Sequence, residues 1–148
     1  MTAPGPQLDA DWRTALGECP LPLPGAILVG GWRLAVTPLP PADLPPDWQA
    51  ACGPWRLFAD AAALRHAVLT GPRPGLRIAP LGMGGKRRRL VDVFRSHKVP
   101  PILRDRWPLL VDCRDGQVLW VCGLQPAEGL RITEHTEQVA LLEWQALA

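Results

Sequence analysis

The chain has 148 residues, of which 47% are hydrophobic, and its formal net charge is +2. This length and this hydrophobic content predict one folded domain with its own core and exclude a disordered tail. The sequence has no apolar run of the roughly 20 residues that a membrane helix needs, and its opening residues lack a secretory signal. We therefore expect a cytoplasmic protein that contacts no membrane.

Positive charge is concentrated between residues 73 and 106. Ten basic residues stand there against Asp92 and Asp105, which gives a local charge of +8. The basic residues are Arg73, Arg77, Lys86, Arg87, Arg88, Arg89, Arg95, Lys98, Arg104 and Arg106. Most are arginine, whose planar guanidinium group suits phosphate contacts. The block predicts a polyanionic partner, typically nucleic acid, and the alternative is a solvated surface without a partner.

The first 24 residues are interpreted as a proline-rich leader or linker that includes a short helix at Leu8–Leu16. The alternating prolines of residues 19–24 remove backbone donors, so no strand or helix is predicted there. A folded domain is expected over residues 25–148. It should begin with two strands within residues 26–36, joined as a hairpin at Gly30-Gly31.

Short elements lead into the basic block. A strand is predicted at Trp55–Ala59, then a helical turn over Ala61–Leu64 that Asp60 caps, and then a strand at Ala67–Thr70. A glycine-rich turn follows at Leu81–Gly85.

The main predicted helix covers Arg87–His97. On a helical wheel its apolar residues form one arc and its arginines lie on the opposite side, which predicts an inner face on the core and a cationic outer face. The apolar residues are Leu90, Val91, Val93 and Phe94, and the outward arginines are Arg88, Arg89 and Arg95.

A second hairpin is predicted after this helix. The runs Leu109–Cys113 and Gln117–Gly123 flank Asp115-Gly116, a dipeptide typical of a two-residue turn, which would place Cys113 opposite Val118. Their continuous apolar character predicts burial on both faces. A last strand is expected at Val139–Trp144.

The sequence contains no motif of a self-sufficient enzyme, such as GxSxG, a Walker loop or GxGxxG. The segment Gly82–Lys86 is interpreted as a plain turn. In the alternative, its N–H groups and the start of the next helix hold one phosphate. Asp105 and Asp112 lie among arginines and are expected to form ion pairs. Among the tryptophans, Trp107 alone is considered for a surface on which bases stack.

Histidines and cysteines give no sign of a metal site. Cys19, Cys52, Cys113 and Cys122 are far apart in sequence, and His66, His97 and His135 have no partner at ligand spacing. We expect reduced cysteines and no catalytic role for a histidine.

Several segments, in matching order, resemble one known family, the C-terminal domain of bacterial tRNA(Ile)-lysidine synthetase. They are Phe58–Leu64, Arg73–Arg77, Pro80–Phe94, Lys98–Pro100, Arg104–Val111, Leu119–Leu124 and Arg131–Glu134. The similarity covers roughly residues 55–144, and the hairpin at 26–36 is included in it. This chain departs from the family at two positions: it has Leu76 where the family usually has Asp, and Thr70 where a basic residue is common. A contact near that turn is therefore expected to be missing.

The resemblance implies an α+β fold, a small mixed or antiparallel sheet with one main amphipathic helix and short helices, shared with a domain of the phenylalanyl-tRNA synthetase β subunit. It implies recognition of tRNA(Ile), notably its acceptor stem, for an ATP-dependent ligase that attaches lysine to the wobble cytidine. ATP with Mg²⁺ and lysine would be used by a catalytic domain with an SGGxDS loop, which this sequence lacks, so no cofactor is expected in this chain.

Two other functions stay open at this stage. The same basic face could serve a protein-interaction or dimerisation module, with a homodimer as one form. An enzyme using Asp92, Asp105 or His97 is the third hypothesis, although no nucleophile and base have the required spacing. The partners expected are tRNA(Ile) and the catalytic domain of the same protein, and not DNA.

Overall fold

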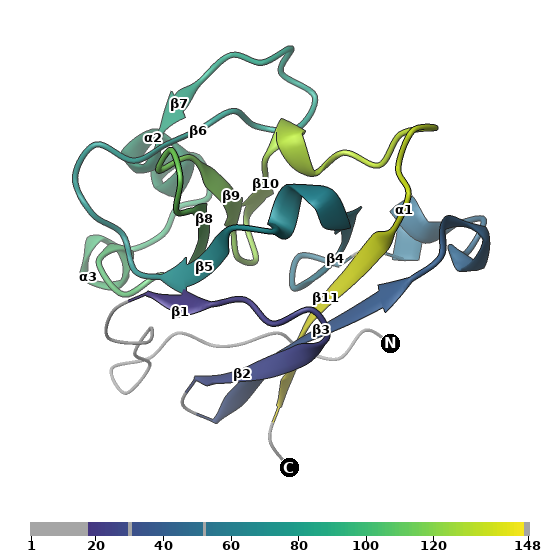
Figure 1. The fold of residues 1–148 in the computed structure, drawn as a ribbon. Coiled ribbons are helices and arrows are strands. Elements are labelled where there is room, and N and C mark those ends of the chain that lie inside the picture. The colour runs from purple at the N-terminus through teal and green to yellow at the C-terminus, as the bar shows by residue number, and fades with distance from the viewer. Residues whose placement is uncertain (1–17, 30, 52, 147–148) are drawn as a thin grey trace.

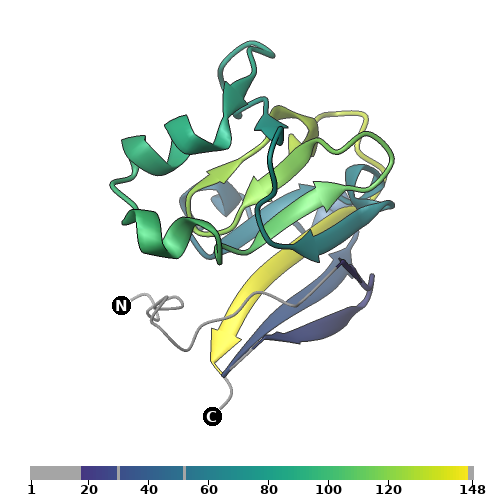
Figure 2. The same ribbon diagram turned by 90° about the vertical axis from the view of Figure 1, so that its left-hand side faces the viewer.

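The computed structural model describes residues 18–29, 31–51 and 53–146. The helix predicted at Leu8–Leu16 and the side chain of Cys52 lie outside the described residues. The described part is an α+β fold with three layers: a four-stranded sheet, a five-stranded sheet, and a layer of short helices with a two-stranded ribbon (Figure 1 and Figure 2). All strand pairs among the described residues are antiparallel, which confirms the predicted fold class.

The four-stranded sheet is built around the last strand of the described chain. Its strands in spatial order are β2 (Gly25–Val29), β3 (Trp32–Leu39), β11 (Val139–Ala146) and β4 (Arg56–Asp60). The first predicted hairpin and the strands predicted at residues 55–59 and 139–144 are therefore confirmed. After β3 come two short helices, η1 (Pro41–Asp43) and α1 (Trp48–Ala51).

The five-stranded sheet forms the middle layer. Its strands in spatial order are β1 (Cys19–Pro20), β5 (Ala67–Thr70), β8 (Leu109–Asp112), β9 (Val118–Val121) and β10 (Gln125–Pro126). All residues of β5, β8 and β9 are buried, so the prediction of burial on both faces is confirmed for β8 and β9.

Two short 3₁₀ helices join the layers. The first, η2 (Ala61–Leu64), begins as predicted, because the Asp60 carboxylate accepts the N–H of Ala62 at 3.0 Å. The second, η3 (Glu128–Leu130), follows β10 and contacts η2.

The prediction that residues 19–24 contain no strand is wrong at their start. Cys19 and Pro20 form β1, which pairs with β5 at the edge of the five-stranded sheet, and the N–H of Leu21 donates to the Ala67 carbonyl oxygen at 3.0 Å. Proline is tolerated there because an edge strand can leave one side of its backbone unpaired.

Two hydrophobic clusters hold the layers together. One fills the space between the two sheets and includes Leu34, Leu142 and Trp120, each with at most 2% of its surface exposed. The other lies between the opposite face of the five-stranded sheet and α2 (Leu90–Ser96), and includes Val93 and Phe94. The predicted apolar face of the main helix is thus confirmed.

The start of this helix differs from the prediction. It begins at Leu90, not at Arg87, because Arg88–Arg89 form a strand, β7, that pairs with β6 (Arg77–Ile78). Arg89 has the extended backbone of a residue that precedes a helix, with φ −77° and ψ 150°. Downstream, the short α3 (Pro101–Arg104) lies beside α2 on the same side of the middle sheet (Figure 2).

The second hairpin has a longer turn than predicted. Val118 lies opposite Val111, not Cys113, and the N–H of Asp112 donates to the Gln117 carbonyl oxygen at 2.8 Å. The turn therefore covers residues 113–116. Its length follows from the Asp112 carboxylate, which accepts the Arg114 N–H at 2.9 Å and so bends the chain before Asp115-Gly116 is reached. Cys113 is exposed, Cys122 is buried, and both carry free thiols.

Candidate nucleic-acid interface

The β6–β7 ribbon decides which arginines point outward. Arg77 lies opposite Arg89, and Ile78 lies opposite Arg88. Since side chains alternate between the two faces of a strand, the ribbon has one face with Arg77 and Arg89 and another with Ile78 and Arg88. Ile78 is 1% exposed, so its face is the inner one. Arg87, two residues before Arg89, continues the outer face.

Arg88 consequently does not lie on the outer face of the ribbon. Its side chain is half-buried, and its Nη2 donates to the Asp92 carbonyl oxygen at 3.1 Å. The prediction that Arg88, Arg89 and Arg95 share the outer face of one helix is therefore wrong. Of these three only Arg95 belongs to α2, where it is exposed in the last turn.

The loop between β6 and β7 projects from the body of the protein (Figure 2). Its base is fixed by η3, because the N–H of Glu128 donates to the Ala79 carbonyl oxygen at 2.7 Å and the Glu128 carboxylate accepts the N–H of Gly82 at 2.9 Å. Arg131 and then Gly82 hold the pKa of Glu128 below its ordinary value by hydrogen bonding to the carboxylate.

These contacts remove the alternative in which Gly82–Lys86 and a helix start hold a phosphate. The Gly82 N–H is already bonded to Glu128, and α2 begins only at Leu90. The other prediction for this segment, a turn, is confirmed: Gly84 and Gly85 have φ of +64° and +84°, values that favour glycine.

Nearby carboxylates neutralise part of the basic block. Arg73 Nη1 lies 2.9 Å from Glu18 Oε1, and Arg89 Nε lies 3.1 Å from Asp92 Oδ2. The hydrogen bond from Arg89 is the main reason that the pKa of Asp92 lies below its ordinary value. Arg104 is half-buried and donates from Nε to the Val99 carbonyl oxygen at 3.1 Å.

Five exposed basic side chains of the block form no ion pair. Within residues 73–106, all of which the structure describes, they are Arg77, Lys86, Arg87, Arg95 and Lys98. Arg106 is half-buried and has a partner of its own. The predicted block is therefore divided between the ribbon with its loop, the end of α2, and the end of α3.

Two hollows adjoin the ribbon, and Arg77 lines both. The first is lined by Arg73, Arg77 and Arg89 together with residues 74–76 and the start of α2. The second is lined by Arg77 and Arg87 on the ribbon side and by residues 115–117 of the β8–β9 turn, with Gly75 and Ala79 between them. Each hollow is lined by at least two guanidinium groups.

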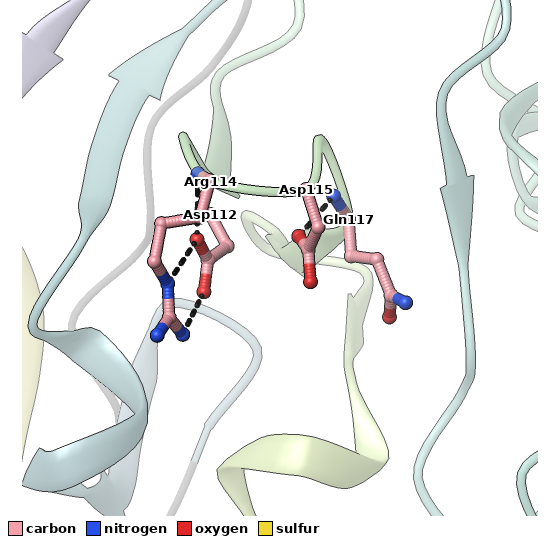
Figure 3. A network of polar contacts seen from close by, with 4 residues as sticks. All are labelled: Asp112, Arg114, Asp115 and Gln117. Carbon is pink, nitrogen blue, oxygen red and sulfur yellow. Dashed lines mark hydrogen bonds and ion pairs between the residues drawn. The ribbon is translucent and has the colours of Figure 1, made fainter.

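The turn beside the second hollow is held by its own polar contacts (Figure 3). The Asp112 carboxylate, 5% exposed, accepts hydrogen bonds from Arg114 Nε at 3.2 Å and Nη2 at 2.9 Å. Asp115 Oδ1 accepts the N–H of Gln117 at 2.9 Å. The predicted ion pairing is confirmed for Asp112.

Sequence reasoning missed Asp115 and Gln117 as neighbours of the arginines. They lie far from Arg77 and Arg87 in the chain, and only the pairing of β5 with β8 and of β8 with β9 brings them together. The exposed Leu81 and Met83 at the loop were also missed, although apolar residues inside a glycine-rich basic turn were a usable signal.

Trp107 is not a surface residue. It is 7% exposed, its Nε1 donates to the Cys122 carbonyl oxygen at 2.7 Å, and its ring lies 6.2 Å from that of Trp55 and 5.9 Å from that of Phe94. The hypothesis that it stacks on bases is wrong, because the second cluster encloses it.

The two departures from the family pattern have a structural account. Leu76 packs against the second hydrophobic cluster, and Thr70 is a buried residue at the end of β5. Neither position therefore presents a charged side chain at this turn.

No group of three or more His, Cys, Asp or Glu side chains among the described residues could hold a metal ion. No helix in the described ranges is long and apolar enough to cross a membrane. His66 and His97 are exposed, and neither lies in an ion pair with a described residue.

Comparison with known proteins gives one consistent family. The model of the TilS substrate C-terminal domain matches residues 68–144. The tRNA(Ile)-lysidine synthase of Geobacter sulfurreducens is 33% identical over 142 residues, which is 93% of this chain and 26% of that protein. That of Geobacillus kaustophilus is 36% identical over 75 residues, which is 51% of this chain and 16% of that protein.

A solved structure agrees with these relatives. The crystal structure of a TilS C-terminal domain superposes with a TM-score of 0.72 at 25% identity, and the match covers 89% of this chain and 98% of that one. The chain spans about a quarter of the length of the Geobacter relative. From the match of fold and sequence over most of its length, the chain belongs to the family of TilS C-terminal domains.

Proposed function

We propose that the surface around the β6–β7 ribbon binds tRNA(Ile), through its acceptor stem, for a larger protein that attaches lysine to the wobble cytidine. The observation that carries this proposal is the outer face of the ribbon, where Arg77 and Arg87 are exposed and form no ion pair with a described residue. Arg77 is held on a paired backbone and Arg87 directly precedes one, which lowers the cost in conformational entropy of meeting a phosphate.

Family membership supports the choice of RNA as the polyanion. The Geobacter and Geobacillus relatives are tRNA(Ile)-lysidine synthases, and the segment that matches the family includes the ribbon and its loop. Arg95 and Lys98 extend the positive surface along α2, and Lys86 extends it into the loop. An elongated surface of this kind suits a phosphate backbone.

The chemistry of lysine attachment belongs, in this proposal, to a catalytic domain outside this chain. ATP with Mg²⁺ needs a phosphate-binding loop and oxygen ligands. The described residues offer neither a group of carboxylates that could hold a metal ion nor free N–H groups at Gly82. The proposal assigns lysine and ATP to that catalytic domain, and tRNA(Ile) to this one.

The test is tRNA binding as a function of salt. The chain, its Arg77→Ala/Arg87→Ala variant and an Arg33→Ala control are titrated with a tRNA(Ile) transcript and with duplex DNA by fluorescence anisotropy. Arg33 is a matched control because it is exposed on the four-stranded sheet, away from the ribbon (Figure 1). The double variant should bind more weakly and lose roughly 1.5 from the slope of log affinity against log salt.

Two results would contradict the proposal. Unchanged tRNA affinity of the double variant at moderate salt would remove the ribbon from the interface. Failure of the chain to bind tRNA at all, together with self-association in sedimentation that depends on Arg77 and Arg87, would favour the interaction or dimerisation module instead.

A further inference from the structure

The second hollow is lined by side chains of opposite charge that do not form an ion pair with each other. Arg77 and Arg87 line it from the ribbon, and Asp115 lines it from the β8–β9 turn. No nitrogen of either arginine lies within ion-pair distance of the Asp115 carboxylate, although all three residues are described and exposed. The hollow is therefore open between a cationic and an anionic side.

The Asp115 carboxylate is held in place by the turn. Asp112 fixes the backbone before it by accepting the N–H of Arg114 at 2.9 Å and, through its carbonyl oxygen, the N–H of Gly116 at 2.8 Å. Gly116 has φ +73°, which a side chain would disfavour. Asp115 Oδ1 accepts the Gln117 N–H (Figure 3), and Oδ2 accepts no hydrogen bond from a described residue.

A bare phosphate does not fit this set of charges. Arg77 and Arg87 attract it, but Asp115 would repel it at short range. The complementary ligand places a hydrogen-bond donor directly beside an anion. Ribonucleic acid has this arrangement at each nucleotide, because the ribose 2′-hydroxyl lies next to the phosphate that follows it, and DNA lacks it. Amino groups of the bases are separated from the phosphate by the sugar.

We propose that Asp115 accepts a hydrogen bond from one ribose 2′-hydroxyl while Arg77 and Arg87 hold the phosphate beside it, so that this hollow distinguishes RNA from DNA. The inference rests on the proposed function, since it assigns a contact within the same interface. It adds a chemical reason for rejecting DNA, which positive charge alone does not supply.

The test uses an RNA hairpin with the sequence of the tRNA(Ile) acceptor stem and a set of hairpins that each carry one 2′-deoxynucleotide. The chain should lose roughly three- to tenfold in affinity at one ribose, as expected for one hydrogen bond to a charged acceptor near solvent. Losing the 2′-hydroxyl elsewhere should change affinity less.

The decisive variant is Asp115→Asn. Asparagine keeps an oxygen for the Gln117 N–H, and so keeps the turn, but it replaces the second acceptor oxygen with an NH₂ donor. The variant should narrow the difference in affinity between the all-ribose hairpin and the sensitive deoxy hairpin, because a neutral amide makes a weaker hydrogen bond to the 2′-hydroxyl than a carboxylate does. Glu137→Ala removes an exposed carboxylate outside the hollow and should leave the discrimination of the unchanged chain intact.

The outcomes separate this inference from the proposed function. If the hairpin binds in a manner that depends on Arg77 and Arg87, but no deoxy position matters or Asp115→Asn keeps the same sensitivity, the contact to the 2′-hydroxyl is wrong and RNA binding stands. If base changes abolish the effect of Asp115 and deoxy changes do not, the carboxylate reads a base amine and the inference is wrong. If no RNA binds, both fail.

Discussion

Arg77 and Arg89 lie directly opposite each other across the β6–β7 ribbon. Like charges at facing positions of an antiparallel pair destabilise it. Asp92, in the first turn of α2, relieves this repulsion on one side only, through its 3.1 Å contact with Arg89. Arg77 forms no ion pair with a described residue, and it lines both hollows.

Side chains alternate between the two faces of the ribbon, so substitutions of the neighbouring Arg87 and Arg88 should have different effects on binding and stability. Arg87→Ala should weaken tRNA binding and flatten its salt dependence while leaving the free energy of unfolding unchanged, because Arg87 is exposed on the outer face. Arg88→Ala should lower the free energy of unfolding by about 1 kcal/mol, because the half-buried Arg88 donates to the Asp92 carbonyl oxygen. Urea unfolding and anisotropy measure the two effects.

Equal losses of affinity in the two variants, each at unchanged stability, would contradict this assignment. They would mean that both side chains face the RNA. Lys86→Ala changes a second exposed basic residue, and its affinity and stability are compared with those of Arg87→Ala.

Strands and hairpins could be predicted from the sequence because their signals are local. The pattern at residues 26–36 contains its own turn, and the run at Val139–Trp144 is apolar enough to identify a buried strand. The inner face of α2 was also predictable, since Leu90, Val93 and Phe94 repeat with helical spacing.

The position of the arginines could not be predicted in the same way. Arg88 and Arg89 continue the helical pattern of residues 90–96 and have good helix propensity, so the local signal favours a helix. Pairing with Arg77 overrides it, and that pairing depends on Ile78 reaching the second cluster. The neighbourhood of Asp115 depends on the order of strands in the middle sheet, which no local pattern contains.

Asp92→Asn should tighten tRNA binding. The carboxylate holds Arg89 at 3.1 Å, and its removal frees that guanidinium group for phosphate and raises the local positive charge. The same change removes an acidic residue from the first turn of α2, so a small loss of thermal stability is expected. Anisotropy titrations at two salt concentrations measure the gain, which should be larger at low salt. A weaker complex would show that Asp92 orients Arg89 for binding.

Trp107→Phe should destabilise the fold without a specific effect on RNA. The indole N–H donates to the Cys122 carbonyl oxygen at 2.7 Å in a buried site, and phenylalanine leaves that oxygen without its partner. The expected loss is about 1–3 kcal/mol in the free energy of unfolding. Leu124→Ala, a half-buried position beside the same cluster, controls for lost packing. If tRNA quenched the fluorescence of Trp107 through direct stacking, its buried position would be refuted.

The Asp112–Arg114 pair predicts a dependence of stability on pH. Hydrogen bonding from Arg114 is the main reason that the pKa of Asp112 lies below its ordinary value of 3.8. Because the folded state lowers this pKa, the stabilisation by the carboxylate is complete above the unfolded-state pKa and is lost as pH falls through the folded-state pKa. Asp112→Asn should therefore be less stable than the unchanged chain at neutral pH, and the difference should shrink below about pH 4.

Asp43→Asn removes an exposed carboxylate at η1 and provides the matched control for this titration. Urea unfolding of the three proteins from neutral to acidic pH measures the free energies. A constant difference between Asp112→Asn and the unchanged chain over that range would mean that the ion pair contributes nothing that protonation removes. Asparagine keeps an oxygen for the Arg114 N–H, so the same variant should keep the bend before Asp115 and its discrimination between the ribose and deoxyribose hairpins, and the titration then measures the ion pair apart from the proposed recognition.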